Sequence, residues 1–247
     1  MSDFYDDLAP FYHLIYPDWN ASIDRQAACL DALIKGRCPD ASAVLDVACG
    51  IGTQALGLAA MGYDVTASDL SPGAVERARV EAARRGLSIA FDVVDMRKAF
   101  DHFGRTFDIV IACDNAVAHL LTDDDLVSAL SQMRASTRPG GACLVSCRDY
   151  AAEPKAGSQL KPYGVRVENG VRYVLWQVWD FTDGDCYNGD FYFVEDDGSE
   201  PRVTVMRSTY RAIGLDKLIA MMSVAGFVNI CRYDDRFFQP IVVGTRP

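Results

Sequence analysis

The chain has 247 residues, of which 50% are hydrophobic and 23% are charged, and its formal net charge is −10 at pH 7. These proportions suit a soluble globular protein built from one large α/β domain with an elaboration, or from two small domains. The acidic balance argues against a nucleic acid or an anionic membrane as a partner, because both attract clustered Lys and Arg.

The sequence also lacks targeting and metal-binding signals. The first residues are acidic, without the basic and apolar segments of a secretion signal, and no apolar run reaches the roughly 18 residues of a membrane helix. Eight cysteines form no CxxC pair, and three histidines lack metal-ligand spacing. We therefore expect a cytoplasmic protein with free, mostly buried thiols and no metal site.

Residues 1–43 predict a helical cap that is rich in aromatic side chains. Pro17 interrupts the cap, and Asn20 or Ser22 is a candidate N-cap for a helix through residues 23–34. The aromatic residues of this segment would help to close over a substrate site and exclude water from it.

From residue 43 on, short apolar runs alternate with segments of helical periodicity. The expected strands are residues 43–48, 64–69, 89–94, 107–113 and 142–147. The expected helices are residues 73–85, opened by Ser71-Pro72, and residues 123–137, stopped by Pro139-Gly140-Gly141. With two further strands near the C-terminus, this alternation predicts a doubly wound, mostly parallel, seven-stranded Rossmann-like sheet.

Residues 151–210 lack helical periodicity and carry the turn chemistry of β-hairpins instead. Four pairs separate runs rich in Val, Tyr, Trp and Phe, namely Asn169-Gly170, Asp183-Gly184, Asn188-Gly189 and Asp197-Gly198. We interpret the segment as an antiparallel β insertion after strand 5, over the substrate site. The α/β pattern then returns with a helix and a strand hairpin, at residues 215–225, 227–233 and 241–245. The Rossmann-like core would thus comprise residues 44–150 and 211–247.

The most informative segment runs from Val44 to Thr53 and joins a buried strand to a glycine turn and a helix. This is the layout of a nucleotide-binding βαβ unit, in which Gly50 and Gly52 let the backbone approach a ligand closely. The pattern alone fits NAD as well as an adenosyl sulfonium. Asp46 at the strand end would repel a phosphate and attract a cation, which favours S-adenosylmethionine.

Further candidates follow the carboxyl ends of the strands, where open α/β sheets bind ligands. Asp69 is suited to a ribose diol or to helix capping, and Asp95 with Met96 is suited to adenine or to an ordinary loop. Asp114 and Asn115 would meet the methionine ammonium or the incoming nucleophile.

Other residues have both a functional and a structural interpretation. Arg148 would hold a carboxylate through a bidentate pair, or would pair with Asp149. His119 would serve the site or cap a helix, and Arg25 would grip the cofactor or solvate a helix face. An aromatic cluster favours sheet packing, with a cage for a methylammonium or sulfonium as the alternative. Its members are Trp176, Trp179, Tyr187 and Tyr192.

Several segments together resemble class I S-adenosylmethionine-dependent methyltransferases, and most closely the glycine and sarcosine N-methyltransferases. They are Leu45–Thr53, Ser68–Ser71, Asn115–Leu120, Arg138–Gly141 and Arg148-Asp149-Tyr150. The resemblance to the class covers most of the chain outside residues 151–210. It implies an enzyme that transfers a methyl group to a small molecule, most simply to the amine of an amino acid or a related small amine.

The resemblance also implies roles for individual residues. The cofactor-binding residues would be Arg25, Asp46, Ala48, Cys49, Gly50, Gly52, Asp69, Leu70, Asp95, Met96, Cys113 and His119. The residues near the acceptor would be Tyr12, Tyr16, Asp114, Asn115 and Arg148, with Asn115, Arg148 and Tyr150 serving the reaction. Among these, Arg148 would hold the carboxylate of the acceptor.

The sequence departs from the glycine and sarcosine group in three places. Asp114 stands where that group usually has Gly, Ala151 stands where it has Asp, and Ala116-Val117 replaces Ser-Phe. These changes alter the acceptor pocket and put glycine itself in question. An added carboxylate at position 114 favours a cationic or polyamine-like acceptor.

The expected reaction is a direct in-line displacement, in which the protein holds the acceptor nitrogen about 3 Å from the methyl carbon and needs no strong base. One alternative is a small-molecule O-methyltransferase with His119 as its base, whose activity would fall below about pH 6. Two others are a catalytically silent cofactor-binding subunit and, against the charge of Asp46, an NAD-dependent dehydrogenase. The sequence leaves the acceptor, the number of methyl groups and the oligomeric state open.

Overall fold

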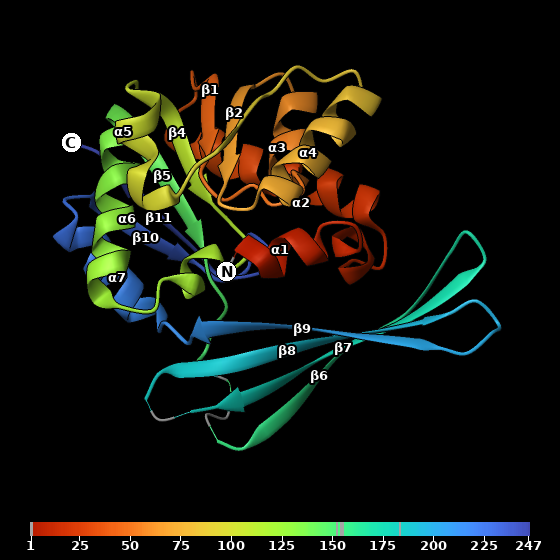
Figure 1. Cartoon of the computed structure of the whole chain (residues 1–247). Helices are drawn as coiled ribbons and strands as arrows, with labels where there is room; N and C mark the ends of the chain where they lie inside the picture. Colours follow the sequence, from red (N-terminus) through yellow and green to blue (C-terminus); the bar gives the residue numbers. More distant parts are fainter. Residues whose placement is uncertain (1, 152, 154–155, 183) are drawn as a thin grey trace.

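The computed structural model of the chain describes residues 2–151, 153, 156–182 and 184–247. It contains a seven-stranded sheet with helices on both faces and a separate four-stranded antiparallel sheet (Figure 1). The large sheet has the strand order β10-β11-β5-β4-β1-β2-β3, in which β11 runs antiparallel to both of its neighbours. This confirms the predicted doubly wound, mostly parallel Rossmann-like sheet with a β insertion and an N-terminal helical cap.

Strands and helices alternate as far as β5, and the strands of the second sheet then follow without a helix between them. The large sheet consists of β1 (Ala43–Asp46), β2 (Asp64–Asp69), β3 (Ala90–Val93), β4 (Phe107–Ala112), β5 (Thr137–Ser146), β10 (Val228–Tyr233) and β11 (Ile241–Thr245). Its helices are α2 (Trp19–Arg37), α3 (Thr53–Ala60), α4 (Pro72–Arg84), α5 (Ala99–Phe103), α6 (Asp123–Ser136) and α7 (Leu215–Val224). The second sheet consists of β6 (Ser158–Glu168), β7 (Val171–Phe181), β8 (Cys186–Asp196) and β9 (Arg202–Arg211). The N-terminal segment adds α1 (Ser2–Leu8) and the 3-10 turn η1 (Tyr12–Ile15), and the 3-10 turns η2 (Met96–Lys98) and η3 (Ala116–His119) follow β3 and β4.

The central parallel strands form the core because both of their faces are apolar. Val44 and Leu45 of β1 and Ile109, Val110 and Ile111 of β4 are fully shielded from solvent. Such continuous apolar runs are typical of parallel strands that helices cover on both sides. The paired strands β1 and β4 thereby present the loops at their carboxyl ends toward α1 and the four-stranded sheet (Figure 1).

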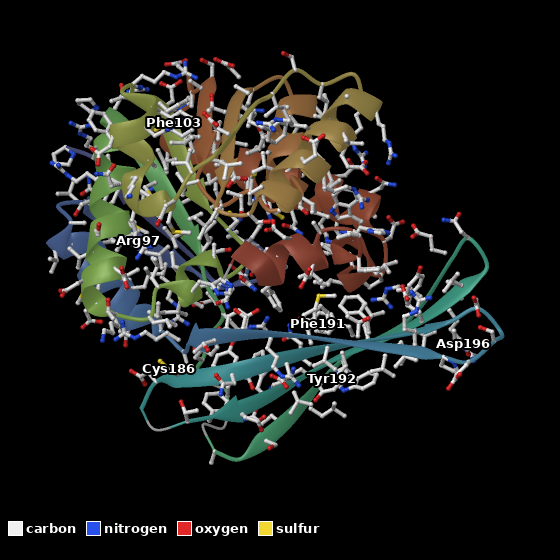
Figure 2. The ribbon with its side chains drawn as sticks, viewed as in Figure 1. Arg97, Phe103, Cys186, Phe191, Tyr192 and Asp196 are labelled. Carbon is white, nitrogen blue, oxygen red and sulfur yellow. The ribbon has the colours of Figure 1, made fainter. Side chains whose placement is uncertain are left out.

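The four-stranded sheet packs one apolar face against the N-terminal cap. The buried cluster between them consists of Phe4, Leu8, Leu14, Leu175, Phe191, Phe193 and Met206. Figure 2 shows Phe191 on the side of the sheet that faces α1 and Tyr192 on the opposite side. The period-two alternation of β-strands therefore gives this sheet one face toward the cap and one face toward solvent.

The same alternation divides the predicted aromatic cluster into two pairs. Trp179 and Tyr187 are each 1% exposed on the inner face. Trp176 and Tyr192 stack on the outer face, with ring centroids 5.1 Å apart. Sheet packing, the favoured interpretation, therefore describes the outer pair, whereas the inner pair belongs to a cavity described below.

Polar contacts tie the cap to both sheets. The Asp6 carboxylate accepts hydrogen bonds from Ser71 Oγ at 2.5 Å and from Gly73 N at 2.7 Å, at the start of α4. The Arg166 guanidinium on β6 donates to the carbonyl oxygens of Ile15 and Tyr16, at 3.3 Å and 3.0 Å. The cap is thus held between the large sheet and the second sheet.

The predicted start of the first long helix is wrong. Helix α2 begins at Trp19, ahead of the proposed caps Asn20 and Ser22. The actual N-cap is Asp18, whose carboxylate accepts a hydrogen bond from Ala21 N at 2.9 Å. A carboxylate at this position satisfies an amide that the first helical turn leaves free.

The predicted role of Pro139-Gly140-Gly141 as a helix stop is also wrong. Helix α6 has already ended at Ser136, and the three residues lie within β5, which begins at Thr137. A Cβ on Gly141 would lie 2.5 Å from the Asp108 carbonyl oxygen of the neighbouring β4. The glycine is therefore required by a close strand contact. The first strand is likewise shorter than expected, since β1 ends at Asp46.

Asn188-Gly189 is not a turn, although the other Asn-Gly pair is one. Asn188-Gly189 lies inside β8, where a Cβ on the glycine would lie 2.8 Å from the ring of Tyr210 on β9. The missing side chain makes room for that ring. Asn169-Gly170 joins β6 to β7, and residues 197–198 lie between β8 and β9, as predicted. Asp183 of the remaining pair lies outside the described residues.

The structure also shows the state of the cysteines and whether its described residues include metal-binding clusters or membrane-spanning helices. The cysteines are all free, and most of them are buried. Within the described ranges, no three His, Cys, Asp or Glu side chains gather in a way that would hold a metal ion. None of the helices in those ranges combines the length and the apolar character that crossing a bilayer demands.

Candidate active site

Two neighbouring cavities lie between the large sheet, the cap and the four-stranded sheet. The larger cavity encloses about 290 Å³ at the carboxyl ends of β1, β2, β3 and β4. The smaller cavity encloses about 70 Å³ and is lined by the cap, by Arg148 after β5 and by inward side chains of β6 to β9. Tyr5, Tyr12 and Asp114 line both, so the cavities adjoin at these side chains.

The glycine turn after β1 forms one wall of the larger cavity. Gly50 has a φ of +52°, which favours glycine, and its backbone N donates to Asp69 Oδ2 at 2.8 Å. A Cβ on Gly50 would lie 3.3 Å from the ring of Tyr12. Gly52 instead caps α3 outside the cavity lining, where its missing Cβ leaves space for the Leu56 side chain.

Asp46 places a buried carboxyl group directly behind this turn. Its side chain is fully buried, with Oδ1 accepting a hydrogen bond from Ala48 N at 3.2 Å. Its Oδ2 has no hydrogen-bond partner among the residues that the structure describes. Burial raises the pKa of the Asp46 carboxyl to about 7, and the negative charge of Asp69 acts in the same direction. Asp46 is absent from the cavity lining, which Val47 and Ala48 supply.

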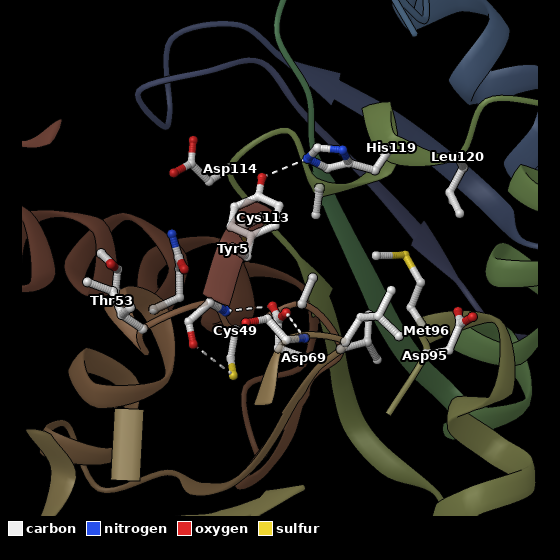
Figure 3. A pocket seen from close by; sticks show the side chains of 18 of the residues that line it. Tyr5, Cys49, Thr53, Asp69, Asp95, Met96, Cys113, Asp114, His119 and Leu120 are labelled. Atoms are coloured by element: carbon white, nitrogen blue, oxygen red, sulfur yellow. Dashed lines mark hydrogen bonds between the residues drawn. The ribbon is translucent and has the colours of Figure 1, made fainter. Parts of the chain in front are cut away.

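Asp69 and Asp95 line the larger cavity from the ends of neighbouring strands. In Figure 3, Asp95 and Asp114 lie at opposite ends of the cavity, and Asp69 lies between them. Asp69 Oδ1 also accepts a hydrogen bond from Ser71 N at 3.0 Å. Burial opposes ionisation of Asp95, but its hydrogen bonds from Arg97 lower the pKa of this carboxyl. Each acid thus faces the cavity and also stabilises a turn, so the two interpretations open for it are compatible.

Arg148 supplies the positive charge of the smaller cavity. Its guanidinium carbon lies 4.8 Å from the centre of the Trp179 ring, and in the described part of the chain its Nε has no hydrogen-bond partner. Asp149 pairs with Arg232 Nη2 at 3.1 Å and not with Arg148, whose guanidinium has a hydrogen bond with Tyr163. A guanidinium held over an aromatic face with an unused N–H is suited to bind a carboxylate.

Asn115 and Tyr150 belong to one hydrogen-bond network beside Arg148. Asn115 Nδ2 donates to Tyr150 Oη at 2.7 Å, and Asn115 Oδ1 accepts from the Arg148 backbone N at 3.1 Å. Tyr150 Oη also lies 2.9 Å from Tyr187 Oη. Asn115 lines the smaller cavity, whereas Tyr150 lies behind it. Tyr150 thus contacts Asn115 from behind and lines neither cavity, and its part in the reaction stays a prediction.

Tyrosines and one histidine surround the junction of the cavities. Tyr5 Oη forms a hydrogen bond of 2.7 Å with His119 Nε2. Burial lowers the pKa of His119 to about 4, so this ring is neutral at pH 7. Tyr16 Oη donates to Asp114 Oδ2 at 3.0 Å. The junction is thus aromatic and neutral except for the Asp114 carboxyl group.

Most of the residues predicted to bind the cofactor do line the larger cavity. They are Ala48, Cys49, Gly50, Asp69, Leu70, Asp95, Met96, Cys113 and His119. Arg25 does not, because it projects from the exposed side of α2, where it donates to Ser22 Oγ at 3.0 Å. Tyr12 and Tyr16, predicted for the acceptor, both line the larger cavity, and of the two only Tyr12 also lines the smaller one.

Several lining residues do not emerge from the sequence alone. They are Tyr5, Tyr163, Gln177 and Tyr210. The period-two pattern of β7, which buries Leu175, Gln177 and Trp179 on one face, indicates that Gln177 faces inward. Tyr5 gives no such indication, because α1 reaches the site only through its tertiary packing on α4 and β9.

Known proteins share both the sequence pattern and this architecture. Residues 44–141 match a family described as a methyltransferase domain. The chain is 29% identical over 181 residues to the glycine/sarcosine N-methyltransferase of Parasynechococcus marenigrum, which covers 69% of this chain and 64% of that protein. It is 31% identical over 144 residues to the dTDP-3-amino-3,6-dideoxy-alpha-D-glucopyranose N,N-dimethyltransferase of Streptomyces fradiae, covering 58% of this chain and 54% of that protein. The aligned part thus spans less than two thirds of the length of these relatives.

The likeness in fold extends further than the likeness in sequence. The solved structure of S-adenosylmethionine-bound CalS10, an amino pentose methyltransferase from Micromonospora echinaspora, has a TM-score of 0.80 to this chain. It covers 96% of this chain and 94% of its own, at 22% identity, so this likeness concerns the fold alone. Residues 44–141 thus match a methyltransferase domain, and the chain shares its fold with an S-adenosylmethionine-bound methyltransferase.

Proposed function

We propose that the protein is an S-adenosylmethionine-dependent methyltransferase that methylates the nitrogen of a small amine, such as an amino acid. The observation that carries this proposal is the junction of the two cavities at Tyr5, Tyr12 and Asp114. A methyl donor in the larger cavity and an acceptor in the smaller one would meet there. Two relatives, at 29% and 31% identity, are named as N-methyltransferases, which supports nitrogen as the acceptor atom.

The larger cavity fits an adenosyl sulfonium better than a dinucleotide. Asp46 keeps one buried carboxylate oxygen without a partner in the described chain, and a cation close by would compensate it. Gly50 provides space that a Cβ would fill against Tyr12. The rings of Tyr5 and Tyr16 add aromatic surface that attracts an onium group. The carboxylates of this cavity would repel the pyrophosphate of NAD.

The smaller cavity fits an acceptor of a few heavy atoms. Its volume of about 70 Å³ lies far below the roughly 300–1,000 Å³ of sites for drug-sized ligands. Arg148 would hold a carboxylate of the acceptor, and the Trp179 ring fixes the direction of the guanidinium. Asn115, itself held by Tyr150, would line the acceptor. An amino acid or a related small amine satisfies these features.

The chain contributes chiefly binding and orientation to the reaction. S-adenosylmethionine supplies a methyl group that its sulfonium already activates. The residues of the junction would hold the acceptor nitrogen in line with this methyl group, which is worth several orders of magnitude in rate. The cap, tied down by Asp6 and Arg166, would keep water out of the junction.

Two measurements test this function. Calorimetric titration should detect binding of S-adenosylhomocysteine and none of NAD. Incubation with S-adenosylmethionine and a panel of amino acids, small amines and phenols, followed by mass analysis, should yield a methylated amine. Binding of NAD without binding of S-adenosylhomocysteine would contradict the donor assignment, and methylation of phenols alone would contradict the acceptor assignment.

A second candidate is an O-methyltransferase for a small natural product, with His119 as the base. The His119 ring lines the larger cavity and, with a pKa of about 4, is neutral and able to accept a proton at pH 7. Activity that depends on His119 as the base would therefore be lost near pH 4. The loss near pH 6 that an ordinary histidine would cause would not appear. A His119→Gln variant that loses transfer to a phenol while retaining transfer to amines would favour this candidate.

A further inference from the structure

Asp114 adopts a backbone conformation that few residues with a side chain adopt. Its φ is +55°, and that of the following Asn115 is +65°. Two consecutive left-handed residues without glycine are uncommon, and such strain gathers at functional sites. The Ser146 hydroxyl oxygen accepts a hydrogen bond from Asp114 N at 2.8 Å and so holds the turn in place. This turn directs the Asp114 carboxylate to the junction of the two cavities.

The carboxylate of Asp114 is bound by neutral donors. Tyr16 Oη donates to Oδ2 at 3.0 Å, and Gln239 Nε2 lies 3.4 Å from Oδ1. The titratable and charged groups that face it are Tyr5, Tyr12, Tyr16, Cys113, Arg148 and Tyr163. Arg148 is the single cation among these facing groups, and within the described residues it forms no ion pair with Asp114. A partly buried carboxylate in such surroundings is incompletely compensated, and a cationic ligand would supply the missing positive charge.

The position of Asp114 distinguishes it from the acids of the larger cavity. Figure 3 shows its carboxylate directed away from Asp69 and from Asp95. It is also the acid that the larger cavity shares with the cavity of Arg148. The smaller cavity thus has a negative end beside the donor site and a positive end at Arg148. This pattern matches a zwitterion that presents its nitrogen to the donor.

We propose that Asp114 binds the ammonium group of the acceptor and takes its proton before methyl transfer, which makes the site selective for amines. This inference rests on the proposed function, which it deepens by naming the protonated amine as the form that binds. Tyr16 and Gln239 act as positioning residues for the carboxylate. Burial, the largest influence, raises the pKa of Asp114 against the effects of Tyr16 and Arg148, and so favours proton acceptance.

The step balances in atoms and electrons. A carboxylate oxygen of Asp114 takes one proton from the ammonium group, and the electron pair of that N–H bond remains on nitrogen. The neutral nitrogen attacks the sulfonium methyl carbon, so that the N–C bond forms as the C–S bond breaks with its electron pair left on sulfur. Asp114 then releases its proton to solvent. One ammonium and one sulfonium give one methylated ammonium, one thioether and one proton.

The test compares Asp114→Asn with the wild-type protein. The affinity for S-adenosylhomocysteine should change by less than about threefold, whereas calorimetry should show weaker binding of an amino acid to that complex. At pH 7, kcat/KM for the amine should fall roughly 100-fold or more, the scale of general-base catalysis. This deficit should shrink about tenfold per pH unit toward the pKa of the amine, because solvent then supplies the neutral nitrogen.

Two variants provide the controls. Asp124→Asn removes the same charge from an exposed position on α6 and should behave as the wild type. Asp114→Gly permits the left-handed backbone without strain and should show the same loss as Asp114→Asn, which excludes misfolding as the cause.

Three outcomes would overturn the inference. Equal transfer to amines by Asp114→Asn would reject any role of the carboxylate, and a deficit that stays constant with pH would reject proton transfer. Loss of S-adenosylhomocysteine binding would assign Asp114 to the donor. A wild-type protein that binds S-adenosylhomocysteine but methylates no amine would refute the proposed function itself, before any variant is made.

Discussion

The two cavities of the site are built from different kinds of sequence. The larger one is lined by short contiguous segments at the ends of β1, β2, β3 and β4, where a glycine turn and strand ends set the geometry. The smaller one is lined by single side chains from the cap, from the segments after β4 and β5, and from every strand of the second sheet. The first depends on local backbone rules and the second on tertiary placement. Substitutions in the smaller cavity should therefore change the choice of acceptor without a change in donor binding.

The largest effect is expected from Arg148→Ala. Removal of one partner of a buried charge pair costs about 2–5 kcal/mol, so KM for a carboxylate-bearing acceptor should rise roughly 30- to 4,000-fold. The affinity for S-adenosylhomocysteine should stay nearly unchanged. Steady-state kinetics and calorimetry measure the two quantities. The matched control is Arg172→Ala, which removes an exposed arginine of β7 and should alter neither. An unchanged KM would show that Arg148 does not bind the acceptor.

The next effect concerns Asp46 and pH in the absence of ligand. Its pKa of about 7 in the folded chain lies above the ordinary value of 3.8, so between these values the unfolded chain releases a proton that the folded chain keeps. Stability should therefore fall as pH rises from about 4 to about 7, by up to about 1.4 kcal/mol per pH unit, and then level off. Asp46→Asn should lack this decline in urea denaturation. Parallel pH curves for the two proteins would contradict the buried, unpaired carboxyl group.

The same carboxyl group gives a prediction for donor binding. If a cation of the donor compensates Asp46, binding must displace the proton that Asp46 carries below pH 7. The affinity of the wild type for S-adenosylhomocysteine should therefore rise as pH increases through about 7, and that of Asp46→Asn should be weaker and flat. Calorimetry at pH 6 and pH 8 measures both. A pH-dependent affinity in the variant would assign the effect to another group.

A smaller effect is expected from Gly50→Ala, for which Gly62→Ala is the matched control. Both glycines have positive φ, +52° and +96°, so both variants should lose about 1–2 kcal/mol of stability. Only a Cβ at position 50 meets a neighbour, the Tyr12 ring at 3.3 Å. The affinity for S-adenosylhomocysteine should therefore fall roughly tenfold in Gly50→Ala alone. Equal losses of affinity in both variants would show that the glycine turn takes no part in donor binding.

The smallest effect is expected from Arg166→Ala. This change removes the hydrogen bonds to the Ile15 and Tyr16 carbonyl oxygens and so loosens the cap. Hydrogen bonds to a charged group contribute about 1.5–3 kcal/mol, but solvent replaces those of a partly exposed arginine in part. We expect kcat to fall a few fold, with little change in the thermal midpoint. Hydrogen exchange in residues 11–16 should increase, and unchanged exchange there would argue against the clamp.

The sequence predicts the larger cavity far better than the smaller one, for a physical reason. A strand that ends in an acid and a glycine turn fixes its own geometry, so Gly50, Asp69 and Asp95 are identified without tertiary information. Gln177 and Tyr210 reach the site only because two sheets and the cap pack together. Turn-forming residues also mislead where packing determines the structure. The Asn188-Gly189 pair predicts a turn, but Gly189 lies inside a strand and makes room for the ring of Tyr210.

Helical geometry explains the residue that the sequence misplaces most clearly. Along α2 the buried residues include Ser22, Ile23, Gln26 and Ala27, which leaves Arg25 on the exposed side. A helical period of 3.6 residues places position 25 away from the core once these neighbours face inward. The resemblance that implies a cofactor contact for Arg25 does not contain this information, whereas the alternative interpretation, an arginine that solvates a helix face, agrees with the exposed position.

One measurement tests nitrogen as the acceptor atom most directly. The protein is given S-adenosylmethionine with an isotope-labelled methyl group, together with amino acids and the hydroxy acids of the same shape, such as glycine with glycolate and alanine with lactate. Each pair offers Arg148 the same carboxylate and differs at the acceptor atom. Mass analysis should find the label in at least one amino acid and in none of the hydroxy acids. Label in a hydroxy acid, or in no member of the panel despite binding of S-adenosylhomocysteine, would contradict the account.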